Sequence, residues 1–135
     1  MKILIDSDFL FGLFVAHDPH HTIAVTQFGE CRKNKAQLFV LTLVIQETAT
    51  VVSHKVDQAA SVDFVRRMRA IANINRIVFD ENLEDGAWRI FEAQTKKGTS
   101  FVDCANMAAL RHYHLDKIFS FDRFYPKELL LPVVQ

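Results

Sequence analysis

The sequence predicts an α/β fold, in which helices cover both faces of a central parallel sheet of four to five strands. Short apolar runs typical of buried strands alternate along the chain with longer amphipathic segments typical of helices. The chain has 135 residues, of which 50% are hydrophobic and 24% are charged, as in one globular domain. We therefore expect a single three-layer α/β/α domain over residues 1–135.

The strands are expected at four apolar runs, because parallel strands that are covered on both faces are apolar along their whole length. These runs are residues 3–5, 38–41, 76–79 and 117–121. A short last strand is expected within residues 129–134. If all of these strands are parallel, their carboxyl ends meet at one edge of the sheet.

Six helices are expected between and after these strands, at residues 9–16, 20–34, 43–54, 57–73, 81–97 and 100–113. The first is apolar nearly all round, which is typical of a helix that is enclosed or shared with a second subunit. Asp8, Thr42 and Asp80 precede helices and are expected to act as N-caps. Gly98 is expected to end the fifth helix.

Charge and cysteine content set broad limits on function. Sixteen basic and sixteen acidic side chains balance, so net charge argues neither for nor against a nucleic-acid partner. The two cysteines, Cys31 and Cys104, form no disulfide framework and fit a reducing cytoplasm. No apolar run reaches the roughly 18 to 20 residues of a membrane span, and the strand-like start carries an acid, unlike a signal peptide. We expect a cytoplasmic protein without a membrane partner.

Four acidic side chains occupy related positions. Asp6 and Asp122 each follow a buried strand directly. Glu47 lies about one turn into the helix after the second strand, on the same face as Val44, and is expected to point inward. Asp103 lies in the first turn of the helix that leads into the fourth strand. Because ligands bind at the carboxyl edge of open α/β sheets, we expect these acids to share one site.

A divalent cation is the simplest explanation for such a cluster. Carboxylates a few ångströms apart repel one another and raise one another's pKa values. Oxygen-rich sites with open water positions suit Mg²⁺ or Mn²⁺. Such a metal can hold a phosphate oxygen, activate a water and stabilise a leaving oxygen.

Each acid also has a purely structural alternative. Asp8 is expected to cap the first helix. Ser100 and Asp103 have the spacing of a capping box. Asp122 fits a turn after a strand, and Glu47 fits a local ion pair on its helix. All of these alternatives would have to hold together for the acidic site to vanish.

These motifs together resemble the PIN-domain nucleases, in particular the small VapC-type toxins of toxin–antitoxin pairs. Residues 5–8 match the family's strand followed by Asp, although Asp8 stands where Asn is commoner. Glu47 matches the family's Glu after the second strand. Residues 100–103 match its hydroxyl, two apolar residues and Asp, and residues 119–122 match its strand ending in Asp. In length and element order the resemblance covers nearly the whole chain.

The resemblance implies a Mg²⁺- or Mn²⁺-dependent endoribonuclease that cleaves RNA with a metal-activated water. The metal ligands and catalytic residues would be Asp6, Glu47, Asp103 and Asp122. The residues that support these ligands would be Ser7, Asp8 and Ser100. The resemblance also implies a homodimer and inhibition by a cognate antitoxin protein.

Two other functions stay open from the residues alone. The run from Asp6 to Asp8 also fits the start of haloacid-dehalogenase-type phosphatases, with Asp6 as the nucleophile. Against this, Leu10 stands where Thr or Val is expected, and no later lysine and paired-Asp motif is found. A PIN-like module that binds RNA or protein without cutting is the other alternative.

The histidine and arginine clusters are expected to have no catalytic role. His17, His20 and His21 surround Asp18 and Pro19, which is typical of a solvated loop. The basic side chains between residues 66 and 69, and those between residues 111 and 127, fit a solvated face or contacts with RNA phosphates.

Overall fold

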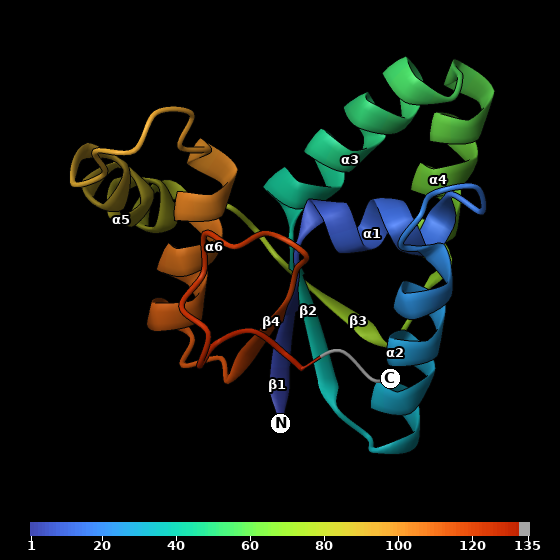
Figure 1. Ribbon diagram of the computed structural model, residues 1–135, viewed down its shortest axis with the longest axis horizontal. Helices are drawn as coiled ribbons and strands as arrows, with labels where there is room; N and C mark the ends of the chain where they lie inside the picture. The colour runs from blue at the N-terminus through green and yellow to red at the C-terminus, as the bar shows by residue number, and fades with distance from the viewer. Residues whose placement is uncertain (133–135) are drawn as a thin grey trace.

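The computed structural model describes residues 1–132 and contains a sheet of four parallel strands. The strands are β1 (Lys2–Ile5), β2 (Gln37–Leu41), β3 (Ile74–Ile77) and β4 (Lys117–Phe119). Their spatial order is β3-β2-β1-β4, so β1 lies in the middle of the sheet between β2 and β4 (Figure 1). The expected parallel α/β architecture is confirmed.

Six helices in this part of the chain cover the sheet. They are α1 (Ser7–Phe14), α2 (His21–Lys33), α3 (Thr42–Lys55), α4 (Gln58–Ala70), α5 (Glu81–Glu92) and α6 (Phe101–His112). In Figure 1, α5 and α6 lie on one side of the strands, α2 and α4 lie on the other, and α1 and α3 start at the carboxyl ends of β1 and β2. This is the arrangement that right-handed crossovers produce when the strand order reverses after β3. Within residues 1–132, no helix has the length and apolar character needed to cross a membrane.

The core surrounds the two central strands and α6. Leu4 and Ile5 of β1 and Val40 of β2 have no exposed surface. Every residue of α6 from 103 to 110 is buried, which its small side chains allow by close packing. Each large apolar side chain buried in this way contributes about 1.5–3 kcal/mol to stability. This packing fixes the sheet edge from which the acidic side chains project.

The observed boundaries differ from the predicted ones where pairing decides them. β3 begins two residues earlier than expected because Ile74 pairs with Leu38 and Ile77 pairs with Leu41. β4 ends at Phe119, because the chain turns at the next residues. The expected last strand is reduced to a single parallel bridge between Ile118 and Leu130, and residues 133 and 134 lie outside the described range.

The predicted N-caps are confirmed in one case and wrong in two. The Asp80 carboxylate accepts a hydrogen bond from the Leu83 backbone N–H at 3.0 Å and caps α5. Thr42 is already the first residue of α3, and its hydroxyl oxygen accepts from the Phe79 backbone N–H at 3.1 Å. Thr42 therefore links α3 to the segment after β3. Asp8 does not cap α1, because the residue two positions earlier takes that role.

Candidate functional site

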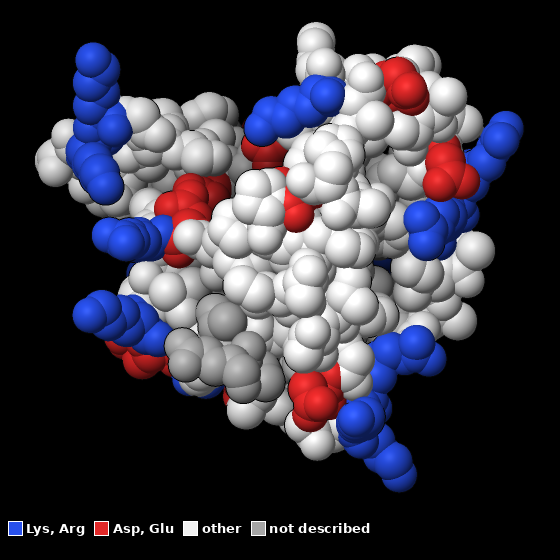
Figure 2. Space-filling view, turned by 45° about the vertical axis from the view of Figure 1, so that its right-hand side comes forward, with Lys and Arg blue, Asp and Glu red and all other residues white. Residues whose placement is uncertain are grey.

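The carboxyl edge of the sheet brings together side chains from β1, β4, α3 and α6. Ile5 pairs with Phe119, so β1 and β4 end at the same level and the acids that follow them are neighbours. In Figure 2, several acidic side chains lie in and beside the notch between the two upper lobes of this face, while other acidic and basic side chains are spread along its margins. The predicted meeting of the acids at this edge therefore has the expected topological basis.

Asp6 is the most enclosed of these acids, with 2% of its surface exposed. Its Oδ1 accepts from the Ser7 backbone N–H at 2.7 Å and from Asn106 Nδ2 at 3.0 Å. Its Oδ2 accepts from the Ser120 hydroxyl at 2.8 Å and from the Tyr125 hydroxyl at 3.2 Å. Burial raises the pKa of Asp6, while the hydrogen bonds oppose that rise. Asp6 also serves as the N-cap of α1.

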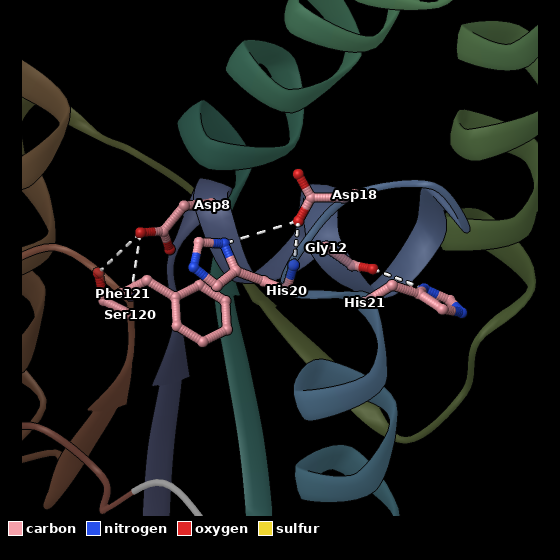
Figure 3. Close-up of polar contacts among 7 residues, drawn as sticks. All are labelled: Asp8, Gly12, Asp18, His20, His21, Ser120 and Phe121. Atoms are coloured by element: carbon pink, nitrogen blue, oxygen red, sulfur yellow. Dashed lines mark hydrogen bonds and ion pairs between the residues drawn. The ribbon is translucent and has the colours of Figure 1, made fainter.

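Asp8 bridges α1 to the segment after β4 (Figure 3). Its Oδ2 accepts from the Phe121 backbone N–H at 2.9 Å and lies 3.4 Å from the Ser120 hydroxyl. Its Oδ1 is buried and has no hydrogen-bond partner among the described residues. Burial, and then the charge of Asp6, raise the pKa of Asp8 to about 7. Asp8, which was expected to cap α1, thus links the first turn of α1 to the segment after β4.

Asp103 approaches Asp6 from α6. Its Oδ1 lies 3.0 Å from the Tyr125 hydroxyl, which can donate either to this oxygen or to Asp6 Oδ2, so a single hydroxyl lies between the two carboxylates. Burial first, then the charge of Asp6 and contact with Asp122, raise the pKa of Asp103 to about 8. Ser100 caps α6 by accepting from the Asp103 backbone N–H at 3.4 Å. Ser100 thus forms its half of the expected capping box, while the Asp103 carboxylate contacts Tyr125 at the sheet edge.

Glu47 and Asp122 lie at the two open sides of the buried pair. Glu47 is half-buried on α3 and lines a hollow of about 330 Å³ together with Ser7 and Asp8. Its charge adds to the rise of the pKa of Asp6. The local ion pair considered for Glu47 is not formed within residues 1–132.

Asp122 is exposed and takes part in the turn after β4. Its Oδ1 accepts from the Phe124 backbone N–H at 3.0 Å, as the turn alternative predicts. With Ser100 and Asp103 it also lines a second hollow, of about 340 Å³. The two hollows therefore flank the buried carboxylates, and each is bordered by one of the outer acids.

Tyr125 and Asn106 hold the two buried carboxylates, and sequence reasoning missed both. Asn106 has no exposed surface, and its Nδ2 contacts Asp6 Oδ1 and the Tyr125 hydroxyl. Burial and the charges of Asp6 and Asp103 raise the pKa of Tyr125, so the hydroxyl stays protonated. Asn106 carried a readable signal, because it is polar within a run of small apolar helix residues, three positions after Asp103. Tyr125 carried none, since an aromatic residue near a turn is ordinary.

The donor set fits a hard divalent cation. Carboxylate oxygens are the ligands that Mg²⁺ and Mn²⁺ prefer, and a cation would offset the repulsion that raises the pKa values here. The two oxygens of Asp6 face four hydrogen-bond donors, of which the Tyr125 hydroxyl is shared with Asp103. The Ser120 and Tyr125 hydroxyls can release Asp6 without losing a partner, because they also reach Asp8 and Asp103. The buried Asp8 Oδ1 has a free acceptor position.

The four acids do not converge on a common point. Within the described part of the chain, no three His, Cys, Asp or Glu side chains form a ready-made metal site. Asp6 and Asp103 share the Tyr125 hydroxyl, Asp122 contacts Asp103, and the charge of Glu47 acts on Asp6. Binding a cation by three or more of these acids would therefore require at least one carboxylate to shift.

This chain resembles known proteins both in sequence and in structure. A VapC ribonuclease of Archaeoglobus fulgidus is 27% identical over 124 residues, which cover 90% of this chain and 78% of that protein. Among solved structures, VapC20 of Mycobacterium tuberculosis, a sarcin-ricin loop cleaving toxin, has a TM-score of 0.77 at 22% identity. That match covers 89% of each chain and supports the three-layer fold.

A second solved structure is VapBC2 from Rickettsia felis, bound to a DNA fragment from its promoter. It has a TM-score of 0.68 at 10% identity and covers 90% of this chain and 89% of its own. The sequence also matches the PIN domain over residues 3–127, which is most of the chain. The residues that carry this resemblance lie within the matched range and adjoin one edge of the observed sheet. The chain therefore belongs to the PIN domain family.

Proposed function

We propose that this protein is a divalent-metal-dependent endoribonuclease and the toxin of a toxin–antitoxin pair. One observation carries the proposal: Asp6 and Asp103, from elements far apart in sequence, share the Tyr125 hydroxyl at one sheet edge. Like charges this close are unfavourable unless a proton or a cation offsets them, and such strongly perturbed acids are enriched at functional sites. The likeness to VapC ribonucleases supports RNA as the substrate.

In this proposal Mg²⁺ or Mn²⁺ is held by Asp6, Glu47, Asp103 and Asp122. When bound, the cation supplies a Lewis acid that activates water and neutralises charge on the phosphate. Asp6 and Asp103 contact buried hydrogen-bond donors on Asn106 and Tyr125. Glu47 and Asp122 border the two open hollows. The RNA backbone would then cross the edge between these hollows.

Three further residues support the ligands in this proposal. Ser7 donates its backbone N–H to Asp6, and Ser100 begins the helix that carries Asp103. Asp8 fixes the segment after β4 through the Phe121 N–H, which sets the position of Asp122. Each contact orients a carboxylate, as the hydrogen-bonded neighbours of metal ligands do in other proteins.

The geometry does not favour a phosphatase that uses Asp6 as its nucleophile. An attacking carboxylate needs one oxygen free to reach phosphorus. Asp6 is 2% exposed, and its two oxygens accept four hydrogen bonds. The acids that border the two hollows include Glu47, Asp103 and Asp122 but not Asp6, which suits metal binding better than a covalent intermediate on Asp6.

The proposal includes an antitoxin protein as partner, a homodimer and a cytoplasmic location. The solved VapBC2 structure, a toxin–antitoxin pair by its name, supports a protein partner for a chain of this fold. Cys31 and Cys104 are buried and free, which fits a reducing compartment.

The test is an RNA cleavage assay with Mg²⁺ or Mn²⁺, and with excess chelator. We expect cleavage that depends on metal and falls by more than about a hundredfold in Asp6→Asn and in Asp103→Asn, because each loses a ligand. Asp63→Asn, an exposed acid on α4, is the matched control and should cleave normally. Circular dichroism checks that the variants stay folded.

Two results would overturn the proposal. Cleavage that persists in chelator and in both variants would remove the metal site from the mechanism. No cleavage of any RNA, together with no stabilisation by Mn²⁺, would favour a binding module that does not cut.

A further inference from the structure

Four stacked rings run from the core to the edge of the candidate site. Phe119 of β4 stacks on Phe9 of α1, with ring centroids 4.3 Å apart and planes 3° apart. Phe9 is followed by Phe121 at 6.0 Å and 27°. The last ring is His20, which lies 4.0 Å from Phe121 at 11°. Phe9 and Phe119 are buried, whereas the His20 side chain is 48% exposed.

The loop that carries His20 is fixed at several points (Figure 3). The His20 backbone N–H donates to Asp18 Oδ2 at 3.0 Å, and the His20 ring Nδ1 lies 3.7 Å from the same oxygen. The next ring, His21, contacts the Gly12 carbonyl oxygen of α1 at 2.8 Å through Nδ1. His20 is thus a flat ring held in a defined position on a partly exposed loop.

His20 lines the hollow that also contains Asp8 and Glu47. This hollow measures about 330 Å³, near the lower end of pockets that bind small ligands. Phe121 is not among its lining residues, so the His20 ring separates Phe121 from the hollow. Phe11 also lines the hollow, and Lys55 Nζ lies 5.5 Å from the centre of the Phe11 ring.

We propose that this hollow binds one nucleobase of the RNA substrate, stacked on the free face of His20. The proposal rests on the ribonuclease function proposed above and places the base beside the phosphate that is cleaved. Proteins that bind single-stranded RNA stack unpaired bases on flat side chains, histidine among them. His20 already has one face on Phe121, so an incoming base would extend the four-ring stack by one.

Charge favours a base over a phosphate in this hollow. Its walls carry three carboxylates, on Asp8, Asp18 and Glu47, against one cation on Lys55. A phosphate would be repelled there, whereas the N–H groups of a neutral base can donate to carboxylates. The hollow on the other side of the site is more basic, since Lys96, Lys97 and Arg123 line it together with two acids, Asp103 and Asp122. In this proposal the RNA base therefore occupies the hollow beside His20, and the RNA backbone runs past the hollow lined by Lys96, Lys97 and Arg123.

The test compares protein variants on intact and abasic RNA. A cleavable oligonucleotide is made with a single abasic nucleotide at each position near the cut in turn. We expect His20→Ala to raise KM on the intact strand by about tenfold with little change in kcat, because stacking contributes to binding. His20→Phe should restore most of that loss. His54→Ala, on an exposed histidine of α3, is the matched control.

One abasic position should abolish the difference between His20→Ala and the natural protein. Equal penalties for His20→Ala at every abasic position would overturn the inference, because the ring would then not contact a base. A His20→Phe variant as damaged as His20→Ala would overturn it as well, since a proton-transferring or ligating role needs nitrogen.

A binding assay separates this inference from the ribonuclease proposal. In an Asp103→Asn background, RNA with 2-aminopurine at the matching position should lose fluorescence on binding, as stacked 2-aminopurine does. The loss should disappear when His20→Ala is added. If the natural protein cleaves no RNA, the proposed function fails, while this quenching still decides the base site. Absence of quenching with RNA bound would overturn the base site alone.

Discussion

Two neutral side chains, Tyr125 and Asn106, form hydrogen bonds to the buried carboxylates of the candidate site. Tyr125 lies 119 residues from Asp6 in sequence and 3.2 Å from it in space, and Asn106 fixes both. A hydroxyl has one proton, so Tyr125 can donate to Asp6 or Asp103 but not to both at once. The spacing of the two acids therefore depends on a group that keeps its proton.

Tyr125→Phe removes this hydroxyl and keeps the buried ring. We expect the Kd for Mn²⁺ to rise about tenfold without loss of fold, because residues that orient metal ligands contribute about that much to affinity. Electron paramagnetic resonance of free Mn²⁺ measures the change without RNA. Tyr113→Phe, at an exposed position, is the control. Unchanged affinity in Tyr125→Phe would show that the hydroxyl does not orient the ligands.

The pKa values of Asp8 and Asp103 predict how stability depends on pH. Both are raised in the folded protein, from 3.8 to about 7 and about 8. The protonated forms are thus favoured by folding, and this contribution is complete below pH 3.8. It is lost as the pH rises through about 7 and about 8.

With chelator present, the melting temperature should therefore fall by a few degrees between about pH 6 and about pH 8.5. Mg²⁺ should raise it more at the upper end of this range than at the lower end, since the cation binds the ionised carboxylates. Differential scanning calorimetry measures both effects, and Asp103→Asn should flatten the fall. A chelated protein that becomes more stable over this range would contradict the assignment.

The sequence predicted which acids lie at the sheet edge better than it predicted which side chains contact them. Asp6, Asp103 and Asp122 could be placed at one edge because each adjoins a strand or helix end. The roles of Asp6 and Asp8 were reversed in one respect, since Asp6 is the helix cap and Asp8 contacts Phe121. Tertiary contacts decided this, and no local pattern reports them.

At the scale of elements, alternation of strands and helices was sufficient to predict the architecture. The four apolar runs all form strands, within two residues at their starts. Helix ends were less predictable: α5 ends at Glu92 instead of near residue 97, and α4 covers less than residues 57–73. Caps and packing decide such ends, and amphipathic periodicity alone does not locate them.

Capping should contribute to stability independently of the site. Asp80→Ala removes the acceptor for the Leu83 N–H at the start of α5. We expect it to lower the free energy of unfolding by about 1 kcal/mol in urea denaturation, with RNA cleavage per folded molecule unchanged. Asp85→Ala, an exposed acid in the same helix, should cost less. Equal effects would show that the cap does not stabilise α5.

At the scale of the whole molecule, zero net charge means that attraction to RNA must be local. Lys96, Lys97 and Arg123 line the hollow beside Asp103 and form no ion pair within the described residues. These three side chains are exposed and free to contact phosphates.

Replacing each of these three cations by alanine should weaken RNA binding for every sequence alike. The slope of log K against log salt should fall by about one for each phosphate that a variant no longer binds. Fluorescence anisotropy with labelled RNA over a salt series measures it. Lys2→Ala, at the opposite edge of the sheet, should leave the slope unchanged. A common slope for all variants would place the backbone elsewhere.

The position of a bound cation connects all three scales. Anomalous diffraction from crystals soaked in Mn²⁺ locates the ion without reference to activity. We predict a peak at the carboxyl edge of β1 and β4, about 2.0–2.2 Å from oxygens of Asp103 and at least one of Asp6, Glu47 and Asp122. A protein that cleaves RNA but binds Mn²⁺ only away from these carboxylates would contradict the assignment of this edge as the metal centre.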